Sequence, residues 1–269
     1  MKFILSVIFF FVFHVIVSAQ FIYSPFPLSQ TDFAKINQLK YTKCLVFKIE
    51  NGEKYLVKEA EYGNMGLLSN IYEKGTNDNG DSINISETVY KYDGKGKLTR
   101  ITNVDEESGE VITSFTYDPG GRLTIKRVVT IDPPTYSYKY DSKGRISEAR
   151  VTQLMPGMDS EGNFTGKSIE VPALRQIFKY NIKGQLAEES VYNIRNKEPE
   201  FEYKYVWVYD GQGRVIEYKR TDADGNTLNK SRFEYNREGL LSKSVESNDD
   251  DVTEEVFLYE YNREKQSWK

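Results

Sequence analysis

Tyr138-Lys139-Tyr140-Asp141-Ser142-Lys143-Gly144-Arg145-Ile146 is one copy of the nine-residue phrase that decides the fold of this chain. The phrase has the form aromatic-x-Tyr-Asp/Asn-x-x-Gly-x-aliphatic. Five further good copies begin at Tyr90, Phe115, Phe178, Trp207 and Phe233, and two degenerate copies cover residues 60–68 and 259–267. Degenerate end copies are typical of repeat arrays, because a terminal unit has no outer neighbour to cover it. The recurrence therefore predicts a repeat protein.

Each phrase has the residues of a tight turn. A type I turn favours Asp or Asn at its first position, Pro at its second and Gly at its fourth, and Asp118-Pro119-Gly120-Gly121 meets all three preferences. The aromatic residue and the Tyr ahead of the turn are two positions apart, so in a strand they share one face, and the residue between them points to the other. Each repeat is therefore predicted to be a β-hairpin with one apolar and one polar face.

The repeat spacing sets the number of strands. Tyr92 and Tyr235 lie 143 residues apart and enclose five intervals, so one repeat averages about 29 residues and holds two strands. Asn51-Gly52 predicts a further hairpin with a type I′ turn, residues 153–172 are interpreted as a protruding loop, and no helical periodicity exceeds a turn or two. We expect an all-β protein of roughly sixteen strands, an array of about eight hairpins in a long curved antiparallel sheet or open spiral.

The N-terminus has the pattern of a cleaved secretory signal. Lys2 is followed by an apolar run over residues 3–17 and by Val17-Ser18-Ala19. We expect a signal peptide at 1–19, an N-terminal segment with a capping hairpin at 20–59 and the repeat array at 60–269. The mature protein is then secreted, periplasmic or on the cell surface. A retained membrane anchor is the alternative, although the run is short for a span.

The composition leaves little catalytic chemistry. His14 is the only histidine and would leave with the signal, so no imidazole base or histidine metal site remains. Cys44 is the only cysteine and is predicted to be a small buried residue. Asp93, Asp118, Asp141 and Asp210 occupy positions where Asn stands in other copies, which favours turn capping over acid–base roles. We predict no catalytic residues, no cofactor and no metal site; weak calcium binding in the acidic turns at 77–81, at 222–226 and at Asp249-Asp250-Asp251 is the alternative.

One strand carries an aromatic stripe that the repeat does not demand: Phe201, Tyr203, Tyr205, Trp207 and Tyr209, alternating with other residues. If exposed, such a stripe is a means of stacking on sugars or apolar ligands, and it is the predicted binding site. The alternative is that it packs against the aromatic residues of neighbouring repeats. A formal net charge of −4, with mixed charge signs along the chain, does not indicate nucleic-acid binding.

The phrases Tyr138 to Ile146 and Trp207 to Val215 resemble the YD repeat of bacterial Rhs and wall-associated proteins. In that family, strips of β-hairpins wind into a shell that encloses a toxin domain in the large members, and related animal proteins support cell adhesion. The resemblance implies a secreted or surface β-repeat protein that is not catalytic. Because this chain has only about eight units and no recognisable self-cleaving segment or toxin domain, we expect a short, open member.

Three functional hypotheses remain at the level of sequence. The leading one is a non-catalytic binding or adhesion module of the cell envelope, with a glycan or protein partner and no membrane span after signal cleavage. The second is a structural or accessory component of a surface or polymorphic-toxin system. The third is a carboxylate-dependent glycan hydrolase, which needs two acids across a cleft. The sequence does not identify such a pair.

Overall fold

The computed structural model describes residues 30–76, 82–105, 109–129, 134–158, 164–196, 198–248 and 254–263. Within these residues the chain forms one α-helix, one short 3-10 helix and sixteen strands. The helices are α1 (Gln30–Leu39) and η1 (Asn64–Gly66). The strands are β1 (Lys43–Glu50), β2 (Glu53–Tyr62), β3 (Leu68–Thr76), β4 (Ser82–Tyr92), β5 (Leu98–Asp105), β6 (Gly109–Tyr117), β7 (Leu123–Val129), β8 (Thr135–Tyr140), β9 (Ile146–Met158), β10 (Phe164–Tyr180), β11 (Leu186–Asn193), β12 (Glu200–Tyr209), β13 (Val215–Thr221), β14 (Thr227–Tyr235), β15 (Leu241–Asn248) and β16 (Glu254–Asn262).

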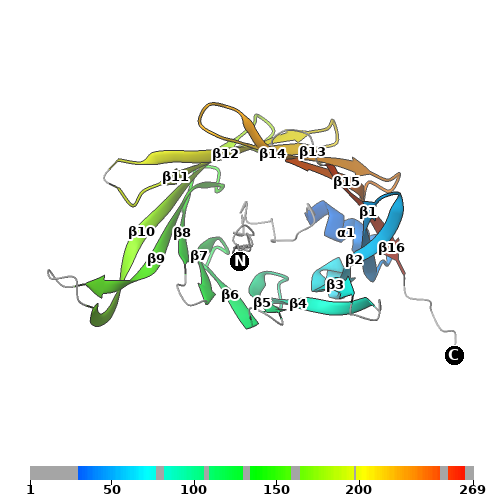
Figure 1. Ribbon diagram of the computed structural model, residues 1–269, viewed down its shortest axis with the longest axis horizontal. Coiled ribbons are helices and arrows are strands. Elements are labelled where there is room, and N and C mark those ends of the chain that lie inside the picture. The colour runs from blue at the N-terminus through cyan, green and yellow to red at the C-terminus, as the bar shows by residue number, and fades with distance from the viewer. Residues whose placement is uncertain are drawn as a thin grey trace, which may run out of the picture.

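The sheet closes on itself. Every strand pairs antiparallel with its sequence neighbours, and β1 also pairs with β16 over seven residue pairs, from Lys43↔Asn262 to Ile49↔Val256. The result is a closed barrel, seen as a ring in Figure 1. The all-β antiparallel fold and the strand number are confirmed, but the expected open sheet or spiral is wrong. Closure is favoured because it removes the two edges that an open array would leave exposed.

Charged side chains also join the two strands of this seam. Lys48 of β1 forms ion pairs with Glu255 of β16 at 2.8 Å and with Glu50 at 2.7 Å. The hydrogen bonds that Lys48 donates, first to Glu255 and then to Glu50, raise the pKa of Lys48 above its ordinary value. Lys54 of β2 reaches across β1 to Glu260 of β16. The last strand is therefore held by ion pairs as well as by backbone pairing.

The inner face of the barrel carries the buried apolar clusters and many aromatic rings, with polar side chains among them. In Figure 1, α1 lies inside the ring, next to β1 and β2. Its Phe33 and Ile36 belong to one buried cluster with Cys44, Ala60 and Leu68, so these strand residues point inward. Cys44 is fully buried, as predicted, and burial raises the pKa of its thiol to about 12. Alternation along each strand then assigns the remaining side chains to the inner or the outer face.

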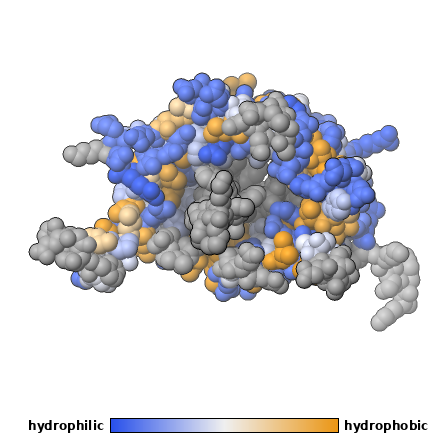
Figure 2. Space-filling view, viewed as in Figure 1, coloured by the Kyte–Doolittle hydropathy of each residue, from blue (hydrophilic) through white to orange (hydrophobic). Residues whose placement is uncertain are grey.

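The outer face carries many charged side chains, together with exposed apolar ones such as Val104 and Val129. Its ion pairs include Lys43–Glu59 at 2.6 Å, Lys179–Glu188 at 2.7 Å and Lys243–Glu234 at 2.9 Å. Figure 2 shows hydrophilic residues along much of the outer margin of the ring. Each such exposed pair contributes little to stability, on the order of 0–1 kcal/mol, so this face chiefly provides a water-compatible surface.

Two segments differ from the expectation from sequence. Residues 30–39 form α1, although the sequence predicts no helix of that length. The helix is short and buries only one side against the barrel, so its apolar periodicity is too brief to recognise. Residues 153–172, predicted to be a loop, lie mostly in β9 and β10, which extend beyond the ring as a two-stranded ribbon. Residues outside a core do not need apolar alternation to pair, so composition alone was misleading there.

The turn chemistry is as predicted. At the quoted repeat, Oδ1 of Asp141 accepts hydrogen bonds from the backbone N–H groups of Lys143 and Arg145, both at 2.9 Å. Gly144 has φ 76°, which glycine adopts without a Cβ clash. The carboxylate has a second function that the sequence reasoning missed, since Oδ2 of Asp141 also binds the Arg145 guanidinium, at 2.6 Å to its NH2 nitrogen.

This ion pair changes the meaning of Asn at the same position. Where Asn181 replaces the Asp, Gln185 replaces the Arg, and Nδ2 of Asn181 donates to Oε1 of Gln185 at 2.9 Å. In the copy at Asn236 the corresponding residue is Leu240, whose backbone N–H donates to Oδ1 of Asn236 at 2.9 Å, so an Asn also supports the turn without a side-chain partner. The ion pair is therefore an addition found in Asp–Arg copies such as Asp141–Arg145, while the backbone hydrogen bonds of the turn are common to Asp and Asn.

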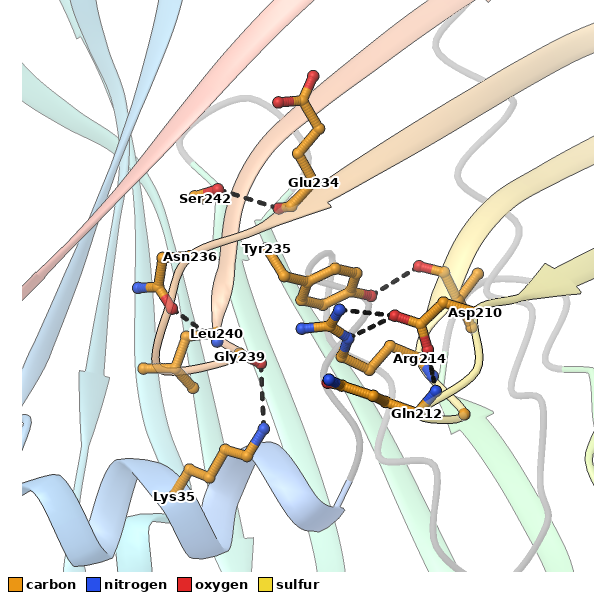
Figure 3. A network of polar contacts seen from close by, with 12 residues as sticks. Lys35, Asp210, Gln212, Arg214, Glu234, Tyr235, Asn236, Gly239, Leu240 and Ser242 are labelled. Atoms are coloured by element: carbon orange, nitrogen blue, oxygen red, sulfur yellow. Dashed lines mark hydrogen bonds and ion pairs between the residues drawn. The ribbon is translucent and has the colours of Figure 1, made fainter.

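Successive repeats are joined by the motif tyrosines. Each hydroxyl donates to the backbone carbonyl of the motif aliphatic residue in the preceding repeat, at 2.5 to 2.8 Å, and Figure 3 shows this bond at Tyr235. The six pairs are Tyr92–Leu68, Tyr117–Leu98, Tyr140–Leu123, Tyr180–Ile146, Tyr209–Leu186 and Tyr235–Val215. We call these bonds the tyrosine staples.

The tyrosine staples connect neighbouring repeats beyond the point where backbone pairing between their strands ends. Backbone pairing between β9 and β10 ends at Glu148↔Ile177, and beyond it the Tyr180 hydroxyl bonds to the carbonyl of Ile146. The Arg145 guanidinium lies 4.3 Å from the centre of the Tyr180 ring and also binds Asp141, so one turn supports the staple of the next repeat. Burial raises the pKa of Tyr180 to about 12, which keeps its hydroxyl protonated and able to donate.

Replacing Tyr180 by Phe removes one staple with little change in ring packing. We expect Tyr180→Phe to lower the free energy of unfolding by about 1–2 kcal/mol, because the carbonyl of Ile146 loses its donor in a partly buried position. Tyr192→Phe, on the outer face, is the control and should change stability by less than about 0.5 kcal/mol. Urea unfolding of both variants checks this, and equal stabilities would contradict the proposed contribution of the staple.

Candidate functional site

Four members of the predicted aromatic stripe lie on the inner face of β12. Tyr203 pairs with Val191, which is fully buried, and Tyr205 pairs with Glu189, which is 1% exposed. Trp207 packs against the buried cluster that contains Leu123. Tyr209 forms a tyrosine staple with Leu186. These four side chains thus form part of the barrel interior.

Phe201 lies on the opposite face. The register between β11 and β12 shifts at a bulge, so Val191 pairs with Tyr203 while the next residue, Tyr192, pairs with Phe201. Because adjacent residues of β11 point to opposite faces, Phe201 shares the outer face with Tyr192. Their rings meet edge to face, with 5.6 Å between centroids. A bulge that the sequence did not reveal separates Phe201 from the rest of the stripe.

The inner part of the stripe belongs to a continuous aromatic contact network. The Tyr205 ring lies 5.5 Å from Tyr203, 5.9 Å from Trp207 and 6.2 Å from Tyr218. The Tyr218 ring in turn stacks on Phe233 at 5.8 Å. Aromatic pairs in such geometries contribute about 0.5–1.5 kcal/mol each beyond area burial. The network therefore ties β12, β13 and β14 together from inside.

Ionisable groups accompany these rings in the interior. Nε2 of Gln176 donates to Oε1 of Glu189 at 2.8 Å, and both residues are buried. The Arg220 guanidinium lies 3.8 Å from the centre of the Tyr203 ring, and Nζ of the fully buried Lys126 lies 4.3 Å from the centre of the Tyr136 ring. We call Lys126, Gln176, Glu189 and Arg220 the interior polar group.

Burial shifts the pKa values of two of these residues toward neutrality. Desolvation raises the pKa of Glu189 to about 8, against the opposing effect of the Gln176 hydrogen bond, and desolvation lowers the pKa of Lys126 to about 7. Strongly shifted ionisable groups in an interior are candidates for function, although structural networks shift pKa values too. The interior polar group and the four stripe residues beside it make up the candidate site.

Sequence reasoning missed Lys126 and Glu189, although a signal was present. In each repeat the third residue after the motif aliphatic position faces inward, and it is apolar, small or aromatic in most copies. The residues at this position are Ile71, Ile101, Lys126, Ala149, Glu189, Tyr218 and Ser244. A lysine and a glutamate therefore stand out once the repeats are aligned on their turns.

Several predicted features fall outside this site. The predicted signal at 1–19 and the acidic turns at 77–81 and 249–251 lie beyond the described residues. Within the described part, no three His, Cys, Asp or Glu side chains are grouped so as to hold a metal ion. Oδ2 of Asp222, in a third acidic turn, instead accepts a hydrogen bond from the Asn226 amide at 2.9 Å. Across the described ranges, no helix has the length and apolar character of a membrane span.

Alanine substitutions can separate the two faces of β12. We expect Tyr205→Ala to lower the free energy of unfolding by about 2–4 kcal/mol, because it removes the ring that contacts Tyr203, Trp207 and Tyr218. Phe201→Ala, on the outer face, should cost less than about 1 kcal/mol. Thermal or urea unfolding measures both values, and a larger cost for Phe201→Ala would contradict the assignment of faces.

Glu189 gives the stability a specific dependence on pH. Its pKa is higher in the folded state, about 8, than in the unfolded chain, so between pH 5 and pH 7 the folded state binds more protons. The free energy of unfolding should then fall as pH rises, by about 2 kcal/mol across this window relative to Glu189→Gln. Urea unfolding of both proteins at pH 5, 6 and 7 measures the difference. Parallel pH profiles would mean that Glu189 titrates near its ordinary pKa.

Comparison with known proteins agrees with the architecture. A porin-like protein from Bacteroides uniformis is similar over 82% of this chain and 98% of its own, with 8% identity and a TM-score of 0.50, which bears on the fold alone. A porin-like protein from Bacteroides vulgatus matches the same shares at 12% identity and a TM-score of 0.42. The TcdB2-TccC3 structure matches 77% of this chain and 14% of its own, at 12% identity and a TM-score of 0.29.

The family model for the Teneurin YD-shell matches residues 34–229. Since this match spans well over half of the sequence, the chain belongs to the Teneurin YD-shell family.

Proposed function

We propose that this protein is a secreted or cell-envelope β-shell that binds a glycan or protein partner and does not catalyse a reaction. The observation that carries the proposal is the opposite character of the two faces of the closed sheet. Aromatic side chains such as Tyr205 and Trp207 lie inside, and ion pairs such as Lys43–Glu59 lie outside. This is the arrangement of a shell that stands in water.

The outer face is unsuited to a hydrocarbon environment. Strands that face lipid carry an apolar band, and a Lys or Arg at the bilayer midplane costs about 2–4 kcal/mol. Here Lys139, Arg150 and Arg232 are at least half exposed on the outer surface. The exposed charges support an aqueous environment, and the predicted signal that ends near Ala19 is the reason to propose a compartment outside the cytoplasm.

The barrel supports binding by holding side chains in fixed positions. Strand residues in a closed sheet lose little further freedom when a partner binds, which favours affinity. The four inward members of the aromatic stripe already make structural contacts inside the ring. We therefore propose that the partner binds the outer face, where Phe201 lies. This revises the position of the predicted site and keeps its chemistry.

An accessory role in a surface or polymorphic-toxin system, as in Rhs-type YD-repeat proteins, is the second candidate. It is favoured by the ribbon of β9 and β10 that projects from the ring. Pairing between β8 and β9 ends at Thr135↔Thr152, so the following residues of β9 pair only with β10. Such an edge is able to accept a strand from another chain.

Cell fractionation and affinity capture test the leading proposal together. Expressed with its signal in a bacterial host, the protein should be recovered outside the cytoplasm with Gln20 at its N-terminus. Purified residues 20–269 should stay in the supernatant with vesicles of phosphatidylethanolamine and phosphatidylglycerol, and should retain a glycan or an envelope protein from extracts. Cytoplasmic recovery, stable sedimentation with vesicles or the absence of any retained partner would each contradict it.

A further inference from the structure

The outer face of β9 to β12 carries four side chains in one row across the sheet. Arg150 of β9 pairs directly with Arg175 of β10, Arg175 with Tyr192 of β11, and Tyr192 with Phe201 of β12. Neighbouring strands are about 4.8 Å apart, so the row runs roughly 14 Å across the strands. We call Arg150, Arg175, Tyr192 and Phe201 the outer row. It presents two guanidinium groups followed by two aromatic rings.

Positive charge is in surplus at the arginine end. Glu148 binds Nε of Arg150 at 2.8 Å, NH2 of Arg175 at 2.8 Å and Nζ of Lys139 at 3.1 Å. Three cations thus surround one carboxylate, which leaves two net positive charges in a protein whose formal net charge is −4. Desolvation alone would raise the pKa of Glu148, but the hydrogen bonds from Arg175, Arg150 and Lys139 lower it to about 2. The Glu148 carboxylate is therefore ionised, and both of its oxygens are engaged by the three cations.

The guanidinium groups keep donors for a ligand. Arg150 uses only its Nε toward Glu148, and its side chain is 53% exposed. Arg175 uses Nε and NH2, and its side chain is 39% exposed. Guanidinium groups bind carboxylate and sulfate oxygens through paired N–H donors. Glu148 supplies a single negative charge for three cations, so an anion held by the remaining donors of Arg150 and Arg175 would offset the repulsion that Glu148 leaves uncompensated.

The aromatic end of the outer row suits a sugar ring. Tyr192 and Phe201 are partly exposed and lie edge to face, so they form a fixed apolar corner beside Arg175. Aromatic faces stack on the apolar faces of sugars, and a Tyr hydroxyl adds a polar contact. The nearby carboxylates are occupied, because Glu188 binds Lys179 at 2.7 Å and Glu202 accepts a hydrogen bond from the Asn193 amide at 3.0 Å.

We propose that the outer row binds an acidic polysaccharide, with its carboxylate or sulfate groups on Arg150 and Arg175 and a sugar ring on Tyr192 and Phe201. This inference rests on the proposed binding function and specifies its ligand class. The charge surplus selects an anion, and the adjoining rings favour a glycan over an acidic peptide. The row is formed by four neighbouring strands of one rigid wall, so its spacing is fixed before a ligand arrives.

Titration calorimetry with defined probes tests the inference. The purified protein should bind polygalacturonate as the carboxylate probe or heparin as the sulfate probe, and it should bind neutral dextran and polyglutamate at least about tenfold more weakly. Arg150→Gln should weaken binding about tenfold or more, since it removes the most exposed guanidinium of the row. Tyr192→Ala should also weaken it. Far-UV circular dichroism and melting confirm that each variant is folded.

Arg232→Gln is the matched control. Arg232 is also on the outer face and 50% exposed, but it lies between two carboxylates, Glu217 at 3.7 Å and Glu254 at 3.8 Å, so it has no charge surplus. Its replacement should leave binding unchanged. Equal losses for Arg150→Gln and Arg232→Gln, or equal affinity for polyglutamate, would overturn the glycan site in favour of general charge attraction.

The remaining outcomes separate this inference from the proposed function. If the protein retains a neutral glycan or an envelope protein and Arg150→Gln has no effect on that binding, the outer row is not the site and the binding function stands. If no polysaccharide and no envelope component is retained, both proposals are wrong. If Arg150→Gln weakens binding and Tyr192→Ala does not, the acidic ligand does not stack on the rings and the proposed role of the aromatic end is overturned.

Discussion

The hydrogen bond from each motif tyrosine to the preceding repeat is the interaction on which this structure depends. Backbone pairing forms hairpins, but the pairing between neighbouring hairpins ends before their turns are reached. The tyrosine staples continue the connection beyond that point, and each needs both a long side chain and a donor. A phenylalanine fills the same space without satisfying the carbonyl. The tyrosine of the repeat is therefore required by the junction between repeats rather than by the hairpin itself.

The same junction explains the composition of the turns. Arg145 and Arg214 each bind the turn carboxylate of their own repeat and lie 4.3 to 4.5 Å from the ring of the next staple tyrosine. Gln185 takes a different role, donating to the carbonyl of Gly213 at 3.1 Å, and its turn partner is Asn181. In these three turns the side chain after the glycine pairs with the Asp or Asn of its own turn, and the same side chain also contacts the next repeat. The tyrosine of each nine-residue phrase thus belongs to the junction with the preceding repeat, and the carbonyl of its aliphatic residue belongs to the junction with the following repeat.

Much of the fold followed from the sequence, because local chemistry decides hairpins. Asp141 and Gly144 predicted their turn, and period-two aromatics predicted the strand that precedes it. Closure was not predicted, since the pairing of β1 with β16 depends on curvature summed over all strands and on no local signal. The bulge that turns Phe201 outward was missed for a similar reason: two neighbouring strands decide it jointly. Lys126 and Glu189 were within reach of an alignment of the repeats, whereas the outer row needed the register of four strands.

The seam between β1 and β16 has a consequence for how the chain is ordered around the ring. Backbone N–H of Thr42 donates to the carbonyl of Asn262 at 3.0 Å, so the start and the end of the wall are immediate neighbours. A connection across this seam would be short, and the Asn51-Gly52 turn offers an exposed place for new termini. The first and last strands are therefore paired neighbours like every other adjacent pair in the ring. Moving the termini to that turn would preserve the strand order around the ring, because every strand would keep both of its paired neighbours.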